Sequence, residues 1–369
     1  MKKFNCIFPG LYNYILTKDV GMIPYTLSKY YNTTITTYNN DNYEYMNSLL
    51  QKDNMQLEFL EKTGNEKKDV KQYIKNNAQN IDVIEFYHLR YSILPSYIFT
   101  YKIHNRKGKI HLKLDANNDI IDFLVKRKGI MPSLRRKLVK ILFNYIDVIS
   151  IETLRNYEVL KKSKLVNNNK LMYLPNGVVK TNVKLEKEKT ILYVGYIQKE
   201  NKSIDMLISA ISNMELNDWK LVLIGEIKED MQEFFEEIFN KNPKLREKII
   251  LKGYISDKIE LSKEYAKSNI YCCTSLKESF GISTLEAAYH GNYIISTNVG
   301  GSPDIIEKTG YGQIIEHDEE ILRKTLTNTI NNWNNIKQNP YLIQKIVYNY
   351  FSWDIICKKL NDKLQGINL

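Results

Sequence analysis

Short apolar runs alternate with amphipathic stretches along most of this chain, and this alternation limits its fold more than any other feature. The runs that predict strands are Ile81–Phe86, Lys109–Asp115, Val148–Glu152, Leu171–Leu174, Thr190–Gly195, Trp219–Gly225, Ile249–Tyr254, Asn269–Thr274 and Tyr293–Thr297. Helical periodicity marks Leu134–Tyr145, Ile204–Ser212, Met231–Asn240 and Ile259–Ala266. Because strands that alternate with helices form parallel sheets with crossover helices, the pattern predicts the α/β class.

The length and one charged segment predict two domains. With 369 residues the chain is too long for one compact domain and fits two. Residues 182–189 are rich in Lys and Glu, have no apolar period and precede a new strand. We therefore expect one domain at 1–180, completed by a C-terminal helix at about 352–369, and a second at 181–351. The polar segment Asp41–Asn80 predicts a helix and a surface connection.

Composition and charge exclude several classes of protein. No run of about 18 apolar residues is found, and Pro9 interrupts the first apolar stretch, so we expect a cytoplasmic protein without a secretory signal. The four cysteines lack the spacing of a zinc site. The net charge of +11 reflects either a coding bias or an anionic partner, such as a phosphate-bearing substrate or a membrane face. We expect no nucleic-acid partner, because the basic residues are scattered.

The most informative stretch is a strand followed by a glycine turn and the start of a helix. Asn269–Thr274 leads into Glu278 and Gly281, and a glycine there lets the backbone approach a ligand. Ligands bind at the carboxyl edge of parallel sheets, and the free N–H groups of a helix start favour a diphosphate. Two other interpretations stay open, because Ser283 and Glu286 can form a capping box and Glu278 can be a solvated carboxylate.

The same stretch resembles the signature of the retaining glycosyltransferases of family 4, described as glycosyl transferases group 1. That signature has two glutamates eight positions apart around a Phe-Gly turn, matched here by Glu278, Glu286 and Phe280-Gly281-Ile282. Other matches follow in the family's order: Pro175-Asn176-Gly177-Val178, Ile191–Gly195, Asn201–Asp205, Gly300-Gly301-Ser302-Pro303 and Phe351-Ser352-Trp353-Asp354. They are dense between 171 and 360 and sparse before that.

The resemblance implies a GT-B fold, with two Rossmann-like domains facing across a cleft and a last helix that crosses back to the first domain. It implies a hexosyltransferase-type enzyme that moves a sugar from a nucleotide-sugar donor, with UDP-sugar expected, to a glycan or lipid-linked acceptor. The product would serve cell-surface polysaccharide biosynthesis. Neither a metal nor another cofactor is implied.

Carried over position by position, the resemblance gives roles in donor binding. Glu278 would bond the hydroxyls of the donor sugar, Glu286 would hold the ribose, and Lys202 would neutralise the departing phosphate. The N–H groups of Gly281 and Ile282 would meet the diphosphate or the sugar. The expected donor site is completed by Phe280, Ser283, Gly195, Tyr196 and Gly21, of which Gly21 stands just before a helix start.

One position departs from the family. Tyr196 stands where the family usually has Arg, so either another basic residue replaces that cation or the phosphate is activated less well. This departure favours an alternative function, a catalytically weak GT-B partner subunit that binds a protein or a polysaccharide. The presence of Glu278, Glu286 and Lys202 opposes it. A nucleotide-sugar epimerase on the same fold is disfavoured by the Phe-Gly turn.

The first domain is expected to take the acceptor. Asp115 falls where many family members have a histidine after a strand, and it can bond an acceptor hydroxyl or cap the next turn. His88, after the strand Ile81–Phe86, would face the cleft edge, although a lone histidine is more often structural.

Basic residues at 126–129 and 135–137 flank an amphipathic helix, Leu134–Ile146, that includes Leu138, Ile141, Leu142 and Tyr145. A core-facing helix with a solvated basic face is the favoured interpretation. The alternative is a helix that lies against anionic lipid and makes the protein peripheral on the inner membrane face.

Overall fold

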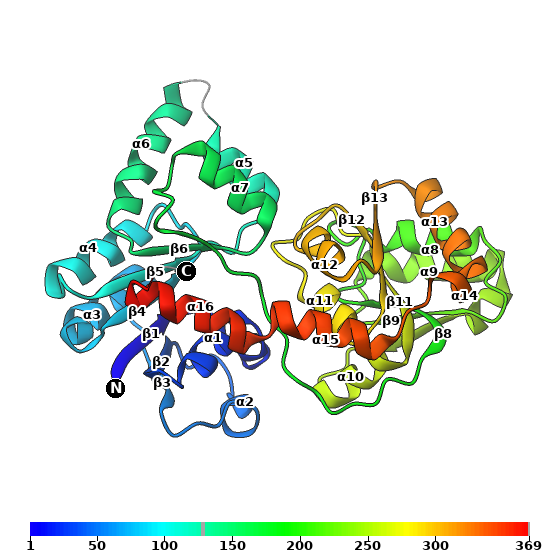
Figure 1. Ribbon diagram of the computed structural model, residues 1–369, viewed down its shortest axis with the longest axis horizontal. Helices are drawn as coiled ribbons and strands as arrows, with labels where there is room; N and C mark the ends of the chain where they lie inside the picture. Colours follow the sequence, from blue (N-terminus) through cyan, green and yellow to red (C-terminus); the bar gives the residue numbers. More distant parts are fainter. Residues whose placement is uncertain (127–129, 368–369) are drawn as a thin grey trace. The chain divides into compact units, whose positions relative to one another are not determined.

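The computed structural model describes residues 1–126 and 130–367, and the chain divides into two compact units (Figure 1). Unit 1 comprises Met1–Gly177 and Trp353–Leu369, and unit 2 comprises Val178–Ser352. The chain therefore passes between the units at 177/178 and 352/353, within three residues of the boundaries expected from the sequence. Both units are α/β, as the alternation of runs predicts.

Unit 1 contains a parallel sheet of seven strands in the order β3-β2-β1-β4-β5-β6-β7. The strands are β1 (Lys2–Ile7), β2 (Tyr31–Thr37), β3 (Met55–Phe59), β4 (Val83–Tyr87), β5 (Lys109–Lys113), β6 (Val148–Ile151) and β7 (Leu171–Tyr173). The interpretation of Asp41–Asn80 as helix and connection is wrong in part, because β3 lies inside it. This edge strand buries only Met55, so it needs few apolar residues and gives little signal.

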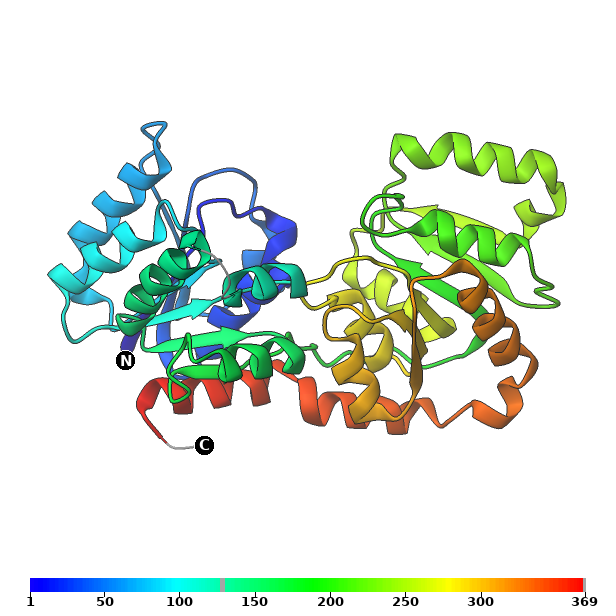
Figure 2. The same cartoon turned by 90° about the horizontal axis from the view of Figure 1, so that it is seen from above.

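Helices cover both faces of this sheet. They are η1 (Asn13–Thr17), α1 (Asp19–Leu27), α2 (Glu44–Ser48), α3 (Glu66–Asn77), η2 (Ala78–Asn80), α4 (Leu94–His104), α5 (Asn118–Val125), α6 (Ile130–Asn144), α7 (Leu154–Ser163) and α16 (Trp353–Gln365). Figures 1 and 2 show α1 and α16 on one face and α3 to α7 on the other. The last helix therefore completes the core of unit 1, as the resemblance implies, and packs against α1.

Unit 2 contains six parallel strands in the order β10-β9-β8-β11-β12-β13. They are β8 (Glu188–Val194), β9 (Lys220–Ile224), β10 (Ile249–Gly253), β11 (Ser268–Cys273), β12 (Tyr293–Thr297) and β13 (Gly312–Ile315), of which the sequence did not predict β13. The strand order reverses between β8 and β11. In open parallel sheets such a switch point is where ligands bind.

Two layers of helices enclose this sheet. They comprise α8 (Ile204–Ser212), α9 (Glu229–Lys241), η3 (Pro243–Glu247), α10 (Lys258–Lys267), α11 (Ile282–Tyr289), α12 (Ser302–Thr309), α13 (Glu319–Asn331), α14 (Trp333–Ile336) and α15 (Pro340–Phe351). Because both faces are covered, the central strands read as continuous apolar runs; Ile191, Leu192 and Tyr193 of β8 are at most 2% exposed.

The cysteines and the membrane prediction can be compared with the structure. All four cysteines are free thiols and buried, which confirms that Cys272 and Cys273 pack as small apolar side chains. Among the described helices, none has the length and apolar content that crossing a membrane requires.

Candidate functional site

Two loops meet at the switch point of unit 2 through an ion pair. Lys202 follows β8 and Glu278 follows β11, and these strands are neighbours in the sheet. The ammonium of Lys202 bonds Glu278 Oε1, and Ser275 Oγ donates to the same oxygen at 2.8 Å. The side chains of Lys202 and Glu278 are 22% and 18% exposed, so neither is a freely solvated group. The interpretation of Glu278 as a solvated carboxylate is therefore wrong.

Further hydrogen bonds join the same two loops. Thr274 Oγ1 donates to the carbonyl of Lys202 at 2.8 Å, and the N–H of Leu276 donates to the carbonyl of Asn201 at 2.9 Å. Thr297, at the end of β12, donates from Oγ1 to the carbonyl of Ser275 at 2.6 Å. The pair of charges thus lies on a framework fixed by three strand ends.

A glycine turn opens helix α11 beside this pair. Gly281 precedes the helix with φ 88°, a left-handed conformation that glycine adopts without the cost a side chain would add. Ile282 and Ser283 follow as the first residues of α11, and the first N–H groups of a helix have no partner within it. Within the described part of the chain, the buried hydroxyl of Thr284 also lacks a hydrogen-bond partner. This helix start therefore offers several donors to an anion.

The Gly300-Gly301 pair supports the glycine turn through close contacts with Phe280. The N–H of Gly301 donates to the carbonyl of Phe280 at 2.7 Å, and a Cβ at Gly300, where φ is 53°, would lie 2.4 Å from that oxygen. A Cβ at Gly301 would lie 2.3 Å from the Phe280 ring. Phe280 itself is 1% exposed, and its place in the donor site stays a prediction. Its role is to support the turn.

Glu286 and Ser283 bond two buried tyrosines, Tyr265 of α10 and Tyr271 of β11. Tyr265 Oη donates to Glu286 Oε2 at 3.1 Å, and Tyr271 Oη donates to Ser283 Oγ at 2.8 Å. Burial, with smaller effects of nearby acidic groups, raises the pKa of Tyr265 and of Tyr271 well above the ordinary value, so both phenols stay protonated donors. The capping-box interpretation is wrong, because Gly281 is the residue before the helix.

Tyr196, which stands where the family usually has Arg, lies beside another cation, Lys228. Tyr196 follows Gly195 at the end of β8, and its carbonyl accepts a hydrogen bond from Tyr193 Oη at 2.9 Å. The Nζ atom of Lys228 lies 4.8 Å from the centroid of the half-exposed Tyr196 ring. Lys228 comes from the loop after β9, the strand next to β8, and also pairs with Glu226 at 2.6 Å. Sequence reasoning missed this cation, although two adjacent parallel strands end at the same sheet edge.

In unit 1, the structure brings together His88 and Asp115. His88 follows β4 and Asp115 follows β5, and Nε2 of the histidine lies 3.0 Å from Oδ2 of the aspartate. The two side chains are 44% and 30% exposed. The carboxylate therefore holds one nitrogen of the ring while the pair remains open to solvent.

A buried ion cluster lies behind this pair, and sequence reasoning missed it. Lys113 Nζ lies 2.7 Å from Glu152 Oε1 and 3.3 Å from Asp19 Oδ2, and Glu152 also accepts the N–H of Asp115 at 3.1 Å. Burial lowers the pKa of Lys113, but the attraction of Glu152 and Asp19 outweighs it and raises the pKa above the ordinary value. The signal was present in the sequence, since charged residues end two otherwise apolar runs.

Gly21 differs from its prediction. It lies within the first turn of α1 and not before it, it is buried, and its N–H donates to the carbonyl of Lys18 at 3.2 Å. A Cβ there would lie 2.0 Å from the carbonyl oxygen of Leu16. Close packing on the preceding 3-10 turn accounts for the glycine, and donor contact at this position stays a prediction.

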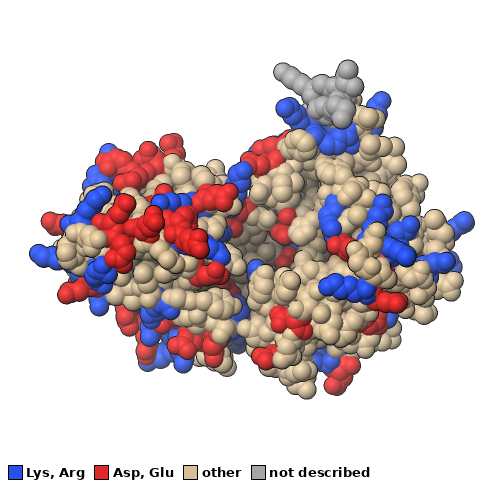
Figure 3. Space-filling model, turned by 180° about the vertical axis from the view of Figure 1, so that it is seen from behind, with Lys and Arg blue, Asp and Glu red and all other residues tan. Residues whose placement is uncertain are grey.

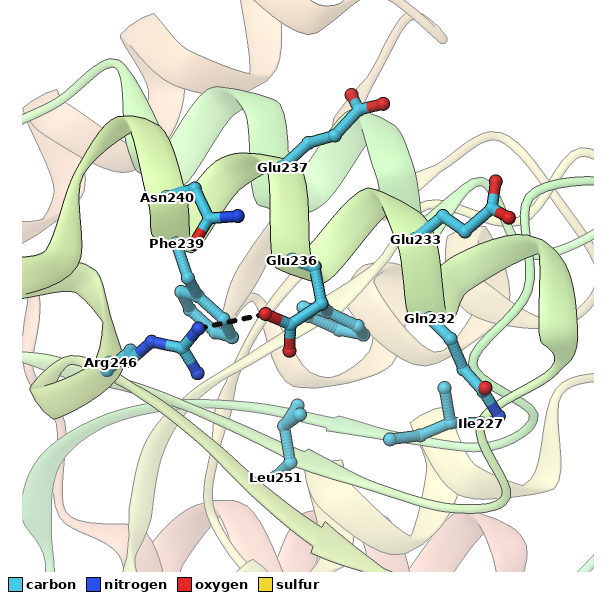
Figure 4. Close-up of a pocket in the computed structure, with 10 residues that line it drawn as sticks. Ile227, Gln232, Glu233, Glu236, Glu237, Phe239, Asn240, Arg246 and Leu251 are labelled. Carbon is cyan, nitrogen blue, oxygen red and sulfur yellow. Dashed lines mark hydrogen bonds and ion pairs between the residues drawn. The ribbon is translucent and has the colours of Figure 1, made fainter.

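Neither a metal cluster nor the cavity of Figure 4 competes with this site. Within residues 1–126 and 130–367, no three or more His, Cys, Asp and Glu side chains gather as a metal would require. A cavity of 780 Å³ lies between α9 and β10 (Figure 4), and among its lining residues Arg246 pairs with Glu236 at 3.0 Å. It opens beside the edge strand and is not lined by Lys202 or Glu278.

Three similar proteins extend this description. An uncharacterized glycosyltransferase of Methanocaldococcus jannaschii is 28% identical over 174 residues, which are 47% of this chain and 43% of that protein. The sucrose-phosphate synthase structure from Thermosynechococcus elongatus aligns with a TM-score of 0.72 at 14% identity, covering 100% of this chain and 99% of that one. HepE of Anabaena, solved with UDP and glucose, aligns with a TM-score of 0.70 at 12% identity, covering 99% and 100%.

The comparisons agree on the fold, and a family model matches unit 2. The alignments span about half the length of the curated relatives. The two units, each built on one parallel sheet, are the Rossmann-like domains of the GT-B fold. The family model described as "Glycosyl transferases group 1" matches residues 179–341, which make up most of unit 2 and include Lys202, Glu278 and Glu286. Through this unit, the chain is similar to the glycosyl transferases group 1 family.

Proposed function

We propose that the chain is a retaining, hexosyltransferase-type glycosyltransferase that moves a sugar from a nucleotide-sugar donor to a glycan or lipid-linked acceptor. The observation that carries the proposal is the Lys202–Glu278 pair at the switch point, beside the amide-rich start of α11. A cation, a carboxylate and free N–H groups at one sheet edge suit a ligand that combines phosphates with hydroxyls.

Each group has a distinct task in this proposal. The diphosphate rests on the N–H groups of Ile282 and Ser283, where the helix dipole favours negative charge. Lys202 stabilises the charge that develops on the departing phosphate. Glu278 accepts hydrogen bonds from sugar hydroxyls, and Glu286, oriented by Tyr265, accepts those of the ribose. No step in this scheme uses a metal or another cofactor.

The Lys202–Glu278 contact also has a role before the donor binds. In the described structure, each charge partly neutralises the other at a site that is largely shielded from water. Phosphate oxygens and sugar hydroxyls would replace this contact with separate ones. The pair would therefore keep the empty site stable and release both groups to the donor.

The donor and the setting are the finer parts of the proposal. UDP-sugar is the proposed donor, and HepE, which shares the fold, was solved with UDP and glucose. A role in cell-surface polysaccharide biosynthesis, in the cytoplasm and peripheral to the inner membrane face, rests on the family resemblance.

A catalytically weak partner subunit is the second candidate function. Tyr196 favours it, because the arginine usual at this position is missing. Lys228, whose ammonium lies over the Tyr196 ring, weakens that argument by returning a cation to the same sheet edge. The two candidates differ in whether the isolated chain turns over a donor.

The test combines donor binding and turnover. Thermal unfolding with UDP-, GDP- and ADP-glucose should show stabilisation by one donor, because a ligand that binds only the folded state raises its melting temperature. Slow hydrolysis of that donor should be lost in Glu278→Gln and retained in Glu233→Gln, an exposed glutamate of α9. Stabilisation without hydrolysis supports the partner subunit. Absence of stabilisation by any sugar nucleotide at millimolar concentration contradicts the proposed enzyme.

A further inference from the structure

Helix α6 exposes a line of large apolar side chains. Leu134, Leu138, Ile141 and Tyr145 are 52%, 61%, 53% and 44% exposed. Their spacing of four and three residues places Leu134, Leu138 and Ile141 along one side of the helix, and Tyr145 follows directly after its last residue. The core is reached instead by Val139, Leu142 and Phe143. The favoured interpretation, a core-facing helix with a solvated basic face, is therefore right in part, because α6 faces the core and also exposes this apolar line.

Neighbouring helices extend this line into a patch. At one end, the rings of Tyr145 and Phe99 of α4 pack with centroids 5.0 Å apart, and Ile103, one turn further along α4, is 73% exposed. At the other end, the guanidinium of Arg135 lies 3.7 Å from the ring centroid of Phe123 on α5. We call this set the α6 patch: Phe99, Ile103, Phe123, Leu134, Leu138, Ile141 and Tyr145.

The charges of α6 itself have one sign. The sequence of α6 carries four basic residues and no acidic one: Arg135, Arg136, Lys137 and Lys140. Two nearby carboxylates are already engaged, since Asp147 pairs with Lys102 at 3.0 Å and Asp122 pairs with Arg155 at 2.7 Å. Of the basic segment 126–129, residues 127–129 lie outside the described chain. On the face seen in Figure 3, acidic side chains gather mainly on unit 2.

Exposed apolar side chains beside basic ones favour a lipid surface over a second copy of the chain as the partner of the α6 patch. A two-fold contact with a second copy would bring the same basic residues together without carboxylates from α6 to neutralise them. A lipid bilayer with anionic headgroups offers an apolar layer for the exposed side chains and phosphates for Lys137 and Lys140.

We infer that the α6 patch docks unit 1 onto an anionic lipid surface, with α6 lying in the plane of the interface. Tyr145 suits the level of the headgroups, where tyrosine and tryptophan concentrate, and Phe99 and Phe123 add apolar area. Lys137 and Lys140 are exposed beside the apolar line and reach the phosphates from the same helix. The inference gives the membrane part of the proposed function a specific surface, and it rests on unit 1 and not on the chemistry of the donor site.

The experiment uses the full chain and lipid vesicles as the probe. Binding is measured by flotation with phosphatidylcholine vesicles and with vesicles that also contain phosphatidylglycerol. The wild type should bind only the anionic vesicles, and less as salt screens the charges. Leu138→Gln/Ile141→Gln and Lys137→Gln/Lys140→Gln should each weaken binding about tenfold or more. The matched controls are Ile259→Gln and Lys241→Gln/Lys244→Gln, which alter exposed residues of unit 2.

Folding of each variant is checked by circular dichroism and by donor-induced thermal stabilisation, which these changes should leave intact. A wild type that does not bind anionic vesicles overturns the inference, as does equal binding by wild type and both patch variants. A wild-type dimer in sedimentation that Leu138→Gln/Ile141→Gln converts to a monomer also overturns it, because the patch would then be a contact between copies. Vesicle binding without sugar-nucleotide binding would leave this inference standing and contradict the proposed enzyme.

Discussion

His88 Nε2 and Asp115 Oδ2 lie 3.0 Å apart, although different strands deliver the two residues. Both residues have positive backbone φ angles, 61° and 40°, which few residues other than glycine adopt. The N–H of His88 donates to the carbonyl of Lys113 at 2.9 Å, and the N–H of Asp115 donates to Glu152. Two unfavourable conformations are thus maintained at one point of unit 1, where the ring of His88 is held by a carboxylate.

This relationship predicts a division of labour between the units. If the His88 ring binds an acceptor hydroxyl, His88→Asn should lower the kcat of transfer about 100-fold. Binding and hydrolysis of the donor, which depend on unit 2, should stay unchanged. His104→Asn on α4 is the matched control. Equal loss of donor hydrolysis and of transfer in His88→Asn would contradict an acceptor role.

A second prediction isolates the support of the glycine turn. Gly300→Ala should destabilise the protein by about 3 kcal/mol, because its Cβ would lie 2.4 Å from the Phe280 carbonyl oxygen. Gly310→Ala has a similar φ of 60° but meets no atom within 4 Å, so only the backbone cost of about 1 kcal/mol should remain. Urea unfolding of both variants gives the difference. Equal losses would show that the contact with Phe280 does not matter.

A third prediction concerns the hydrogen bond that orients Glu286. Tyr265→Phe removes the hydroxyl that donates to Oε2 at 3.1 Å. The carboxylate then loses a fixed partner, and donor affinity should fall about fivefold, as expected for one hydrogen bond. Calorimetric titration with UDP or UDP-glucose measures the change, and Tyr311→Phe, another buried tyrosine of unit 2, is the control. Unchanged affinity in Tyr265→Phe would separate Glu286 from donor binding.

A fourth prediction concerns pH and His290, next to the same tyrosine. Burial, reinforced by Lys187 and opposed by a hydrogen bond to the Glu286 carbonyl, lowers the pKa of His290 to about 4. Because the unfolded chain holds its proton up to about pH 6.5, it binds more protons between these values. The free energy of unfolding should therefore fall, by up to about 3 kcal/mol, as the pH drops from 6.5 to 4.

The control for this prediction is His290→Asn, which keeps a donor for the Glu286 carbonyl. Comparing wild type and variant by urea unfolding at pH 7 and pH 4.5 removes the contribution of carboxylates that both share. The variant should lose less stability on acidification than the wild type. An identical pH dependence would show that His290 is not the group responsible.

Much of the fold could be predicted from the sequence because the central strands are buried on both faces. Ile191–Val194 and Ser268–Cys273 read as apolar runs for this reason, and the strand ends then place Glu278 and Lys202 at one sheet edge. The family resemblance was likewise visible, because the Phe-Gly turn and the glutamates at 278 and 286 lie close together in sequence. The edge strands β3 and β13 were not predicted, since half-exposed strands need few apolar residues. The buried strand β2 was not predicted either, because four of its seven residues are threonines.

The parts that could not be predicted depend on contacts between distant residues. No local sequence pattern predicts that Tyr265 donates a hydrogen bond to Glu286 or that Lys228 lies over the ring of Tyr196. The exposure of Leu138 and Ile141 on α6 could not be predicted either. Helical periodicity shows that they share a side of the helix but not whether that side faces the core. The individual roles proposed for the site residues stay predictions until the variants above are measured.

The position of α16 has a consequence for how the chain is assembled during translation. Cys6 and Val83 belong to a cluster of unit 1 that Trp353 and Leu360 complete, so this cluster lacks one wall until α16 has left the ribosome. Unit 2 is by then fully synthesised and can fold on its own residues. The larger segment of unit 1 is therefore synthesised before unit 2, but its core is completed only after unit 2. A chain released from a ribosome that stalls within unit 2 would still expose apolar surface of unit 1.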